Sequence, residues 1–139
     1  MRNQTIVDFS VLQGKTMRSV VQSVVSHRTG DQDAITFTTV EGEVYTLTHD
    51  QDCCEVVEVE DICGRLEALV GSPLLVAEEY TQDGVPGVPD SDVKRPSTTW
   101  TFYKLATRKG HVTIRWIGRS NGYYSEKVTL YQEVGVETI

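Results

Sequence analysis

The chain has 139 residues, a formal net charge of −7, and hydrophobic and charged fractions of 39% and 24%. This length suits one domain with its own core, and the composition is that of a soluble globular protein. No apolar run is long enough to span a membrane, no secretory signal is apparent, and the acidic balance argues against a general nucleic-acid binder. We therefore expect a single domain over residues 1–139 in a reducing, cytosolic setting.

Charge is distributed unevenly along the chain. Residues 1–93 contain five basic and seventeen acidic residues, whereas residues 94–139 contain eight basic and three acidic residues. A basic segment on an acidic protein can concentrate an anionic ligand at one face. Alternatively, acidic and basic strands pair within one sheet. The sequence leaves both explanations open.

The N-terminal half has the pattern of β-strands. Residues 1–14 are expected to form a loosely ordered lead-in. Alternating polar and β-branched residues then predict a series of strands, at residues 15–25, 34–40, 43–49 and 56–60. Glu41 and Gly42 are typical of a tight turn, so the second and third of these strands should form a hairpin.

One helix is predicted next. Asp61 suits a helix N-cap, and Gly71 suits the position that ends a helix. Between them, apolar residues recur with helical spacing at Ile62, Leu66, Leu69 and Val70. We expect this helix to pack on a sheet.

The C-terminal half is predicted to be mostly strand again. Residues 74–80 favour a strand, and the Pro- and Gly-rich residues 81–97 favour a long surface loop. A three-stranded meander should follow, at residues 98–107, 111–117 and 124–131. The predicted fold class is therefore β-rich α+β, with a curled antiparallel sheet and one helix packed on it.

The stretch HDQDCCE at residues 49–55 has the residue types of a metal site but not the spacing. Cys53 and Cys54 are adjacent and would point to opposite faces of an extended chain, and no CxxC is present. A disulfide is disfavoured in a cytosolic chain, and neighbouring carboxylates oppose a reactive thiolate. We expect one of these two cysteines to lie in the core and the acids to cap a turn or the helix. No metal, no cofactor and no catalytic residues are predicted.

The segment from Trp100 to Tyr131 is both basic and aromatic. It holds both tryptophans, four of the six tyrosines and six of the thirteen Lys and Arg residues, with Glu126 as its one acid. Such a segment suits a planar, anionic ligand. Aromatic rings would stack on a base, guanidinium and ammonium groups would hold phosphates, and an amide would read a base edge. Two alternatives remain open, namely that Trp100 and Phe102 are core residues and that Asn121 serves only the turn.

Three strings in the chain resemble a family of small phage and prophage proteins, the phage Thoeris anti-defence sponges. They are HDQDCCE, EDICGRLEALVGSPLLVAEE and TWTFYKLATRKGHVTIRWIGRSNGYYSEKV, within a likeness that runs from about Lys15 to Tyr131. The resemblance implies a non-enzymatic protein that binds and sequesters a cyclic ADP-ribose-type signal, and in some members also cyclic oligonucleotides. It further implies action in the cytoplasm of the infected bacterial host, as a homo-oligomer built from dimers and extending to a hexamer.

Residue chemistry gives the ligand-binding residues expected under this resemblance. Arg65 joins them because it is the one basic residue in the acidic stretch 40–93, and the full set is Arg65, Trp100, Phe102, Arg115, Arg119, Asn121, Tyr123 and Lys127. Two other functions are kept as alternatives. In one, the acidic stretch 41–79 blocks a basic site on a host defence protein or nuclease. In the other, the protein hydrolyses a nucleotide.

Overall fold

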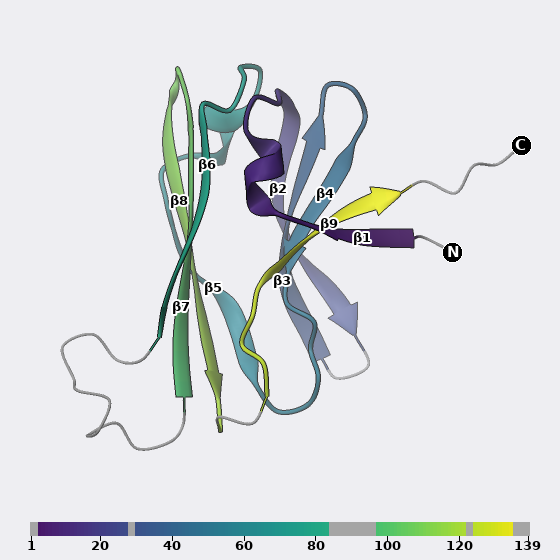
Figure 1. Ribbon diagram of the computed structural model, residues 1–139, viewed down its shortest axis with the longest axis vertical. Coiled ribbons are helices and arrows are strands. Elements are labelled where there is room, and N and C mark those ends of the chain that lie inside the picture. The colour runs from purple at the N-terminus through teal and green to yellow at the C-terminus, as the bar shows by residue number, and fades with distance from the viewer. Residues whose placement is uncertain (1–2, 28–29, 84–96, 122–123, 135–139) are drawn as a thin grey trace, which may run out of the picture.

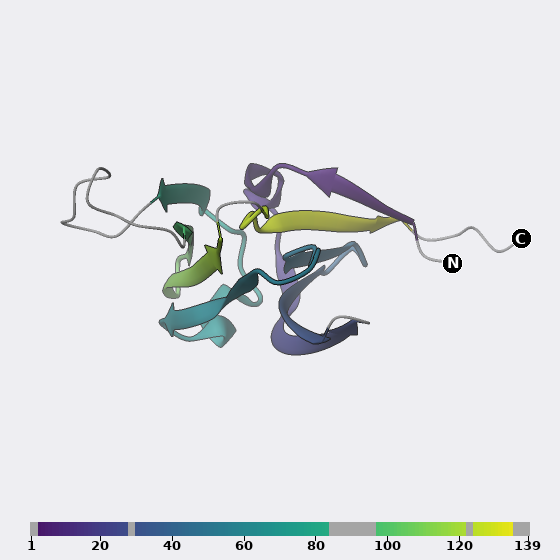
Figure 2. The ribbon, with the colours of Figure 1, turned by 90° about the horizontal axis from the view of Figure 1, so that it is seen from below.

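Two antiparallel sheets face each other and form a sandwich (Figures 1 and 2). The computed structural model describes residues 3–27, 30–83, 97–121 and 124–134. The five-stranded sheet has the order β1-β9-β4-β3-β2, with strands β1 (Asn3–Val7), β9 (Thr129–Val134), β4 (Val44–Thr48), β3 (Gly30–Thr39) and β2 (Met17–His27). The four-stranded sheet has the order β5-β8-β7-β6, with strands β5 (Val56–Cys63), β8 (Gly110–Ser120), β7 (Ser97–Thr107) and β6 (Val76–Asp83).

The core lies between the sheets, because alternate residues of each strand point inward. Trp116 and Tyr103 come from the four-stranded sheet, and Phe37 comes from the other; all three are fully buried. A single 3-10 turn, η1 (Phe9–Leu12), also reaches the core. The ring centroid of Phe9 lies 4.5 Å from that of Tyr103 and 6.3 Å from that of Phe37. Phe9 therefore links the two inner faces.

Several predicted strands are confirmed. β3 and β4 form the predicted hairpin, with Phe37 opposite Tyr45. β7 and β8 pair along their full lengths, from Ser97 opposite Ser120 to Thr107 opposite Gly110. The expected lead-in behaves differently, since its residues 3–12 form β1 and η1. The expected loop at residues 81–97 begins as part of β6, and its residues 84–96 lie outside the described part of the chain.

The predicted helix after Asp61 is wrong. β5 continues through Asp61 and Ile62 to Cys63 and pairs with β8, and only the single 3-10 turn η2 (Leu66–Leu69) follows. Contacts with other elements explain the difference. Leu69 is fully buried in the core, and Thr107 Oγ1 donates a hydrogen bond to the carbonyl oxygen of Ala68. A helical spacing of apolar residues is therefore satisfied here by a strand, a turn and their tertiary contacts.

The α+β fold with one curled sheet is also wrong, since the described residues form two sheets with two one-turn 3-10 helices. The predicted three-stranded meander fails at its third strand. β9 does not pair with β8 but crosses to the five-stranded sheet, where it lies between β1 and β4. A hydrophobic pattern predicts that a segment is a strand, but it does not determine which neighbour that strand takes.

Side chains of β3 cover the free edge of β5. Gln32 Nε2 donates a hydrogen bond to the carbonyl oxygen of Val57 at 2.7 Å, and Asp33 Oδ2 accepts one from the Val59 N–H at 2.9 Å. An edge strand otherwise presents unpaired backbone groups. These two bonds therefore protect the β5 edge and join the sheets along one side. No helix in the described ranges is long and apolar enough to cross a membrane.

Candidate functional site

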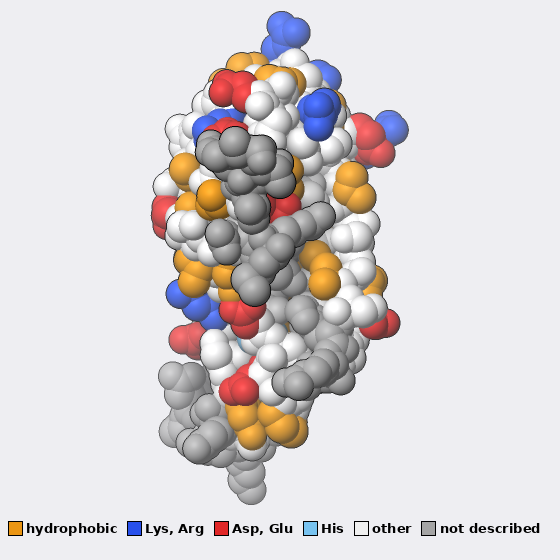
Figure 3. Space-filling view, turned by 90° about the vertical axis from the view of Figure 1, so that its right-hand side faces the viewer, with side chains coloured by type: hydrophobic (Ala, Val, Ile, Leu, Met, Phe, Trp, Pro, Cys, Tyr) orange, Lys and Arg blue, Asp and Glu red, His pale blue; other side chains and the backbone are white. Residues whose placement is uncertain are grey.

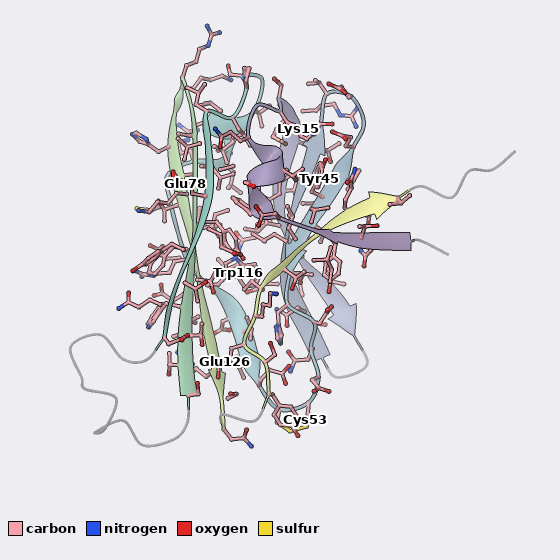
Figure 4. All side chains as sticks on the ribbon, viewed as in Figure 1. Lys15, Tyr45, Cys53, Glu78, Trp116 and Glu126 are labelled. Atoms are coloured by element: carbon pink, nitrogen blue, oxygen red, sulfur yellow. A yellow bond between two sulfur atoms is a disulfide. The ribbon has the colours of Figure 1, made fainter. Side chains whose placement is uncertain are left out.

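Three of the predicted ligand-binding residues lie on the outer face of the four-stranded sheet. Phe102 on β7 is opposite Arg115 on β8, and Trp100 is opposite Ile117. The neighbouring Trp116 points the other way, into the core, as Figure 4 shows. Alternation along β7 and β8 therefore separates the two tryptophans: Trp116 is a core residue, and Trp100 stands on the outside.

The rings on this outer face are close to one another and to a cation. The guanidinium carbon of Arg115 lies 5.4 Å from the centroid of the Trp100 ring, within the range of a cation–π interaction. The Phe102 and Tyr80 rings are 5.9 Å apart with an interplanar angle of 41°. Tyr80 on β6 is 57% exposed. We refer to Tyr80, Trp100, Phe102 and Arg115 as the outer aromatic face.

Sequence reasoning missed Tyr80. It ends a predicted strand, and nothing local indicates that this strand pairs with β7 or that Tyr80 is opposite Phe102. Only the tertiary register brings the two rings together. Figure 3 shows the opposite side of the molecule, where hydrophobic side chains and charges of both signs are interspersed.

Acidic strands flank the basic ones, which accounts for much of the uneven charge along the chain. Arg115 forms an ion pair with Glu60 on β5, and this hydrogen bond raises the pKa of the guanidinium. On the other side, Lys104 on β7 is opposite Glu78 on β6. The sheet order β5-β8-β7-β6 thus places basic central strands between acidic edge strands. Any anion that approaches Arg115 must compete with Glu60.

Three other predicted residues, Arg119, Asn121 and Lys127, lie at or beyond the end of β8. Arg119 and Asn121 line a pocket of about 250 Å³ together with Cys54, Val56, Ser120 and Tyr124. Arg119 is four residues from Arg115, or roughly 13 Å along a strand. Lys127 is exposed, and its carbonyl oxygen contacts His49 Nδ1 at 2.6 Å. Arg119 and Asn121 therefore share a pocket, whereas Lys127 lines a different cavity, beside Glu126.

Arg65 lies away from both the outer aromatic face and the pocket beside Arg119. Arg65 precedes η2 and lies just beyond the end of β5 at which Cys63 is opposite Thr113. Arg119 lies at the other end of the pairing between β5 and β8. The exposed Arg65 side chain lies 3.9 Å from Glu67. Tyr123 lies outside the described residues.

The HDQDCCE stretch folds around one buried carboxylate. Glu55 accepts hydrogen bonds from the backbone N–H groups of Cys53 at 2.9 Å and Asp52 at 2.8 Å, and its Oε2 lies 2.8 Å from His49 Nε2. Burial opposes ionisation of Glu55, but these bonds outweigh it and lower its pKa from 4.5 to about 2. His49 contacts the Lys127 carbonyl through its other ring nitrogen. The prediction that acids cap a turn is therefore confirmed for Glu55.

The cysteine predictions are partly wrong. Cys53 and Cys54 form a disulfide between adjacent residues, which the sequence argument disfavoured. Both are exposed, so neither is a core residue, and the free Cys63 is exposed as well. In the described part of the chain, no three His, Cys, Asp or Glu side chains are close enough together to hold a metal ion.

A comparison with models of protein families shows to which family the chain belongs. A model described as a domain of unknown function, DUF7448, matches residues 10–130, which is most of the sequence. The chain belongs to the DUF7448 family. No curated protein and no solved structure matches it.

The DUF7448 match includes every feature described above as a candidate site. It begins within η1, after β1, and ends inside β9. The outer aromatic face, the Glu55 loop and the pocket beside Arg119 therefore all belong to the DUF7448 domain.

Proposed function

We propose that this DUF7448 protein binds a cyclic nucleotide signal of the cyclic ADP-ribose type and sequesters it without cleaving it. The observation that carries this proposal is the outer aromatic face, where Arg115 is held over the Trp100 ring beside Phe102 and Tyr80. Planar bases stack on exposed aromatic side chains, and a guanidinium binds phosphate through a charge-assisted fork.

Binding would exchange one ionic partner of Arg115 for another. In the free protein, the Glu60 carboxylate forms an ion pair with the Arg115 guanidinium. A ligand phosphate would displace that carboxylate while the base stacks on Trp100 or Phe102. Because Arg115 and Glu60 are both partly exposed, with side-chain exposures of 39% and 35%, the exchange needs no opening of the core.

The resemblance of the sequence to phage anti-defence sponges supplies the biological setting of the proposal. The protein would act in the cytoplasm of an infected bacterium and would deprive a host defence effector of its activating signal. It would do so as a homo-oligomer, with a second copy covering the ligand on the exposed face. Sequestration requires tight binding and slow release rather than turnover.

Calorimetric titration with cyclic ADP-ribose tests the site. Arg115→Gln removes the cation and should weaken binding at least tenfold, because a charge-assisted hydrogen bond contributes about 1.5–3 kcal/mol. Glu60→Gln removes the competing carboxylate and should strengthen binding. Arg18→Gln changes an exposed arginine on β2, in the other sheet, and serves as the matched control. Equal affinities for all four proteins would exclude the outer aromatic face as the site.

A second measurement separates sequestration from the two alternatives. The ligand is released from the complex by heat and its mass is determined. An unchanged mass supports sequestration, whereas a mass increased by one water indicates a hydrolase. If the protein ignores the nucleotide but retains a host defence protein during purification, the acidic-inhibitor function replaces the proposal.

A further inference from the structure

A cavity lies on the inner side of the four-stranded sheet, on the opposite face from the aromatic residues. Its volume is about 350 Å³, near the lower end of the range for small-molecule sites. Inward-facing residues of β6 and β7 form one wall, and the segment before β9 forms the other. The lining residues are Glu79, Thr81, Thr99, Thr101, Ser125, Glu126, Lys127 and Val128.

Glu126 is the buried acidic side chain in this cavity. Glu126 is only 8% exposed, and its Oε2 accepts a hydrogen bond from the Ser120 hydroxyl. Its other carboxylate oxygen, Oε1, is buried and has no hydrogen-bond partner. In Figure 4, Glu126 lies at the lower end of the molecule, where β7 and β8 approach the segment that leads to β9. One acceptor is thus left unpaired beside the cavity.

Strand β8 leaves room for the Glu126 side chain because residue 118 is a glycine. Gly118 lies on the inner face of β8, and a Cβ atom at that position would be 2.7 Å from Glu126 Cβ and 3.3 Å from its Cγ. Any larger residue would therefore push the Glu126 side chain out of the sheet interior. The absence of a side chain at Gly118 and the burial of Glu126 are two parts of one arrangement.

An unpaired, buried carboxylate oxygen would be stabilised by a hydrogen-bond donor. Leaving a buried polar group unpaired costs about 1–3 kcal/mol, and more for a charged group. The wall opposite offers Thr81, Thr99 and Thr101, whose hydroxyl oxygens can accept hydrogen bonds, and the Thr99 hydroxyl itself donates to Asp83 Oδ1 at 3.4 Å. A ligand hydroxyl can donate to Glu126 and to these oxygens, and it can also accept from a threonine hydroxyl. An ammonium group can only donate.

The charged side chains that line the cavity are one cation and two acids. Lys127 lines the same cavity and would repel a second ammonium group. The second acid, Glu79, already accepts a hydrogen bond from the Tyr103 hydroxyl at 2.6 Å, so its charge is partly satisfied within the protein. We propose that this cavity binds the vicinal diol of a sugar, with Glu126 accepting hydrogen bonds from its hydroxyl groups. The diol would come from a free monosaccharide or from the ribose of a nucleoside.

NMR titration of the full-length protein tests this proposal with defined probes. D-ribose and adenosine should both shift the amide signals of residues 125–128 saturably if the site accepts any accessible diol. Saturation by adenosine alone would indicate the ribose of a nucleoside, and saturation by D-ribose alone would indicate a free sugar; each result supports a diol site. The analogue 2′,3′-dideoxyadenosine, which has no diol, should bind at least tenfold more weakly than adenosine.

Variants then assign the binding to Glu126. Glu126→Gln has nearly the same shape and should weaken diol binding at least tenfold, whereas Glu78→Gln, on the same sheet but its outer face, should have no effect. Gly118→Ala should also abolish binding, since it displaces Glu126. The proposal fails if no diol binds saturably, if Glu126→Gln binds the probes as well as the wild type does, or if ethylammonium binds in preference to them. Arg115→Gln should leave diol binding unchanged, so this site and the outer aromatic face can fail independently.

Discussion

Glu55 shows how a single side chain can organise a polar loop. Its carboxylate replaces water as the acceptor for two backbone N–H groups, and it contacts the buried ring of His49. Because the Lys127 carbonyl oxygen can only accept, His49 Nδ1 donates the hydrogen bond between them. The pair thus links the loop at 50–55 to the chain that leads into β9.

The stability contributed by Glu55 should depend on pH. The pKa of Glu55 is about 2 in the folded protein and 4.5 in the unfolded chain, so ionised Glu55 stabilises the fold above pH 4.5. This contribution is lost as the pH falls from 4.5 towards 2. Glu55→Gln should therefore lower the free energy of unfolding by about 1–3 kcal/mol at pH 7, and by much less at pH 3.

Urea unfolding of both proteins at several pH values measures this difference. Glu58→Gln, on the exposed side of β5, is the matched control and should change stability little at either pH. A stability difference between wild type and Glu55→Gln that stays constant between pH 7 and pH 3 would show that the carboxylate charge is not what holds the loop.

At the scale of elements, the alternation of apolar and polar residues predicted most strands. It did not predict which strands pair with each other or where the irregular turns lie. Trp100, Phe102 and Arg115 lie on one outer face because residues in register share a face once β7 and β8 form a hairpin. The sequence alone left open whether Trp100 and Phe102 are core residues. The helix prediction failed because Ile62 belongs to a strand and Leu69 to a turn, two apolar residues whose helical spacing is coincidental. Neither Tyr80 nor Glu126 could be placed, since each depends on contacts between distant segments.

Gly64 directly follows β5, and its substitution should be costly. Its φ is +107°, and a Cβ atom there would lie 2.4 Å from the carbonyl oxygen of His111 on β8. Gly64→Ala should therefore lower the free energy of unfolding by about 2–4 kcal/mol, from backbone strain and from the displaced strand. Thermal or urea unfolding measures the loss.

Gly14→Ala provides the comparison for this prediction. Gly14 has a φ of +88° but no atom within 4 Å of the added Cβ, so its substitution carries the conformational cost alone. The Gly64 variant should be the less stable of the two by at least about 1 kcal/mol. Equal losses of stability in the two variants would mean that the close approach of the added Cβ atom to the His111 carbonyl oxygen is relieved without a further loss of stability.

At the scale of the whole molecule, the first and last strands complete the five-stranded sheet together. β1 pairs with β9 from Asn3 opposite Val134 to Val7 opposite Leu130, and β9 in turn pairs with β4. The DUF7448 match begins at residue 10 and so excludes β1. β1 is thus an edge strand outside the matched region that covers a strand inside it.

Deletion of residues 1–7 should weaken the protein locally. Without β1, the outer edge of β9 loses its hydrogen-bonding partner, so amide hydrogen exchange should accelerate at Leu130–Val134. Exchange in β7 and β8, which belong to the other sheet, should change little. Hydrogen exchange measured by NMR compares the two sheets within one sample. Uniform acceleration throughout both sheets would show that the sandwich unfolds as one unit without β1.

The pairing of β1 with β9 also has a consequence for the order of assembly during synthesis. The hairpins β2–β3 and β7–β8 join neighbours in sequence and can close as soon as their own residues are available. The five-stranded sheet cannot be completed until β9 has left the ribosome, since β9 lies between β1 and β4. Contacts between such distant segments are characteristic of slow folding. Until β9 is available, the edge of β4 with which it pairs has no partner strand. During that interval, pairing with another nascent copy of the chain would compete with native folding.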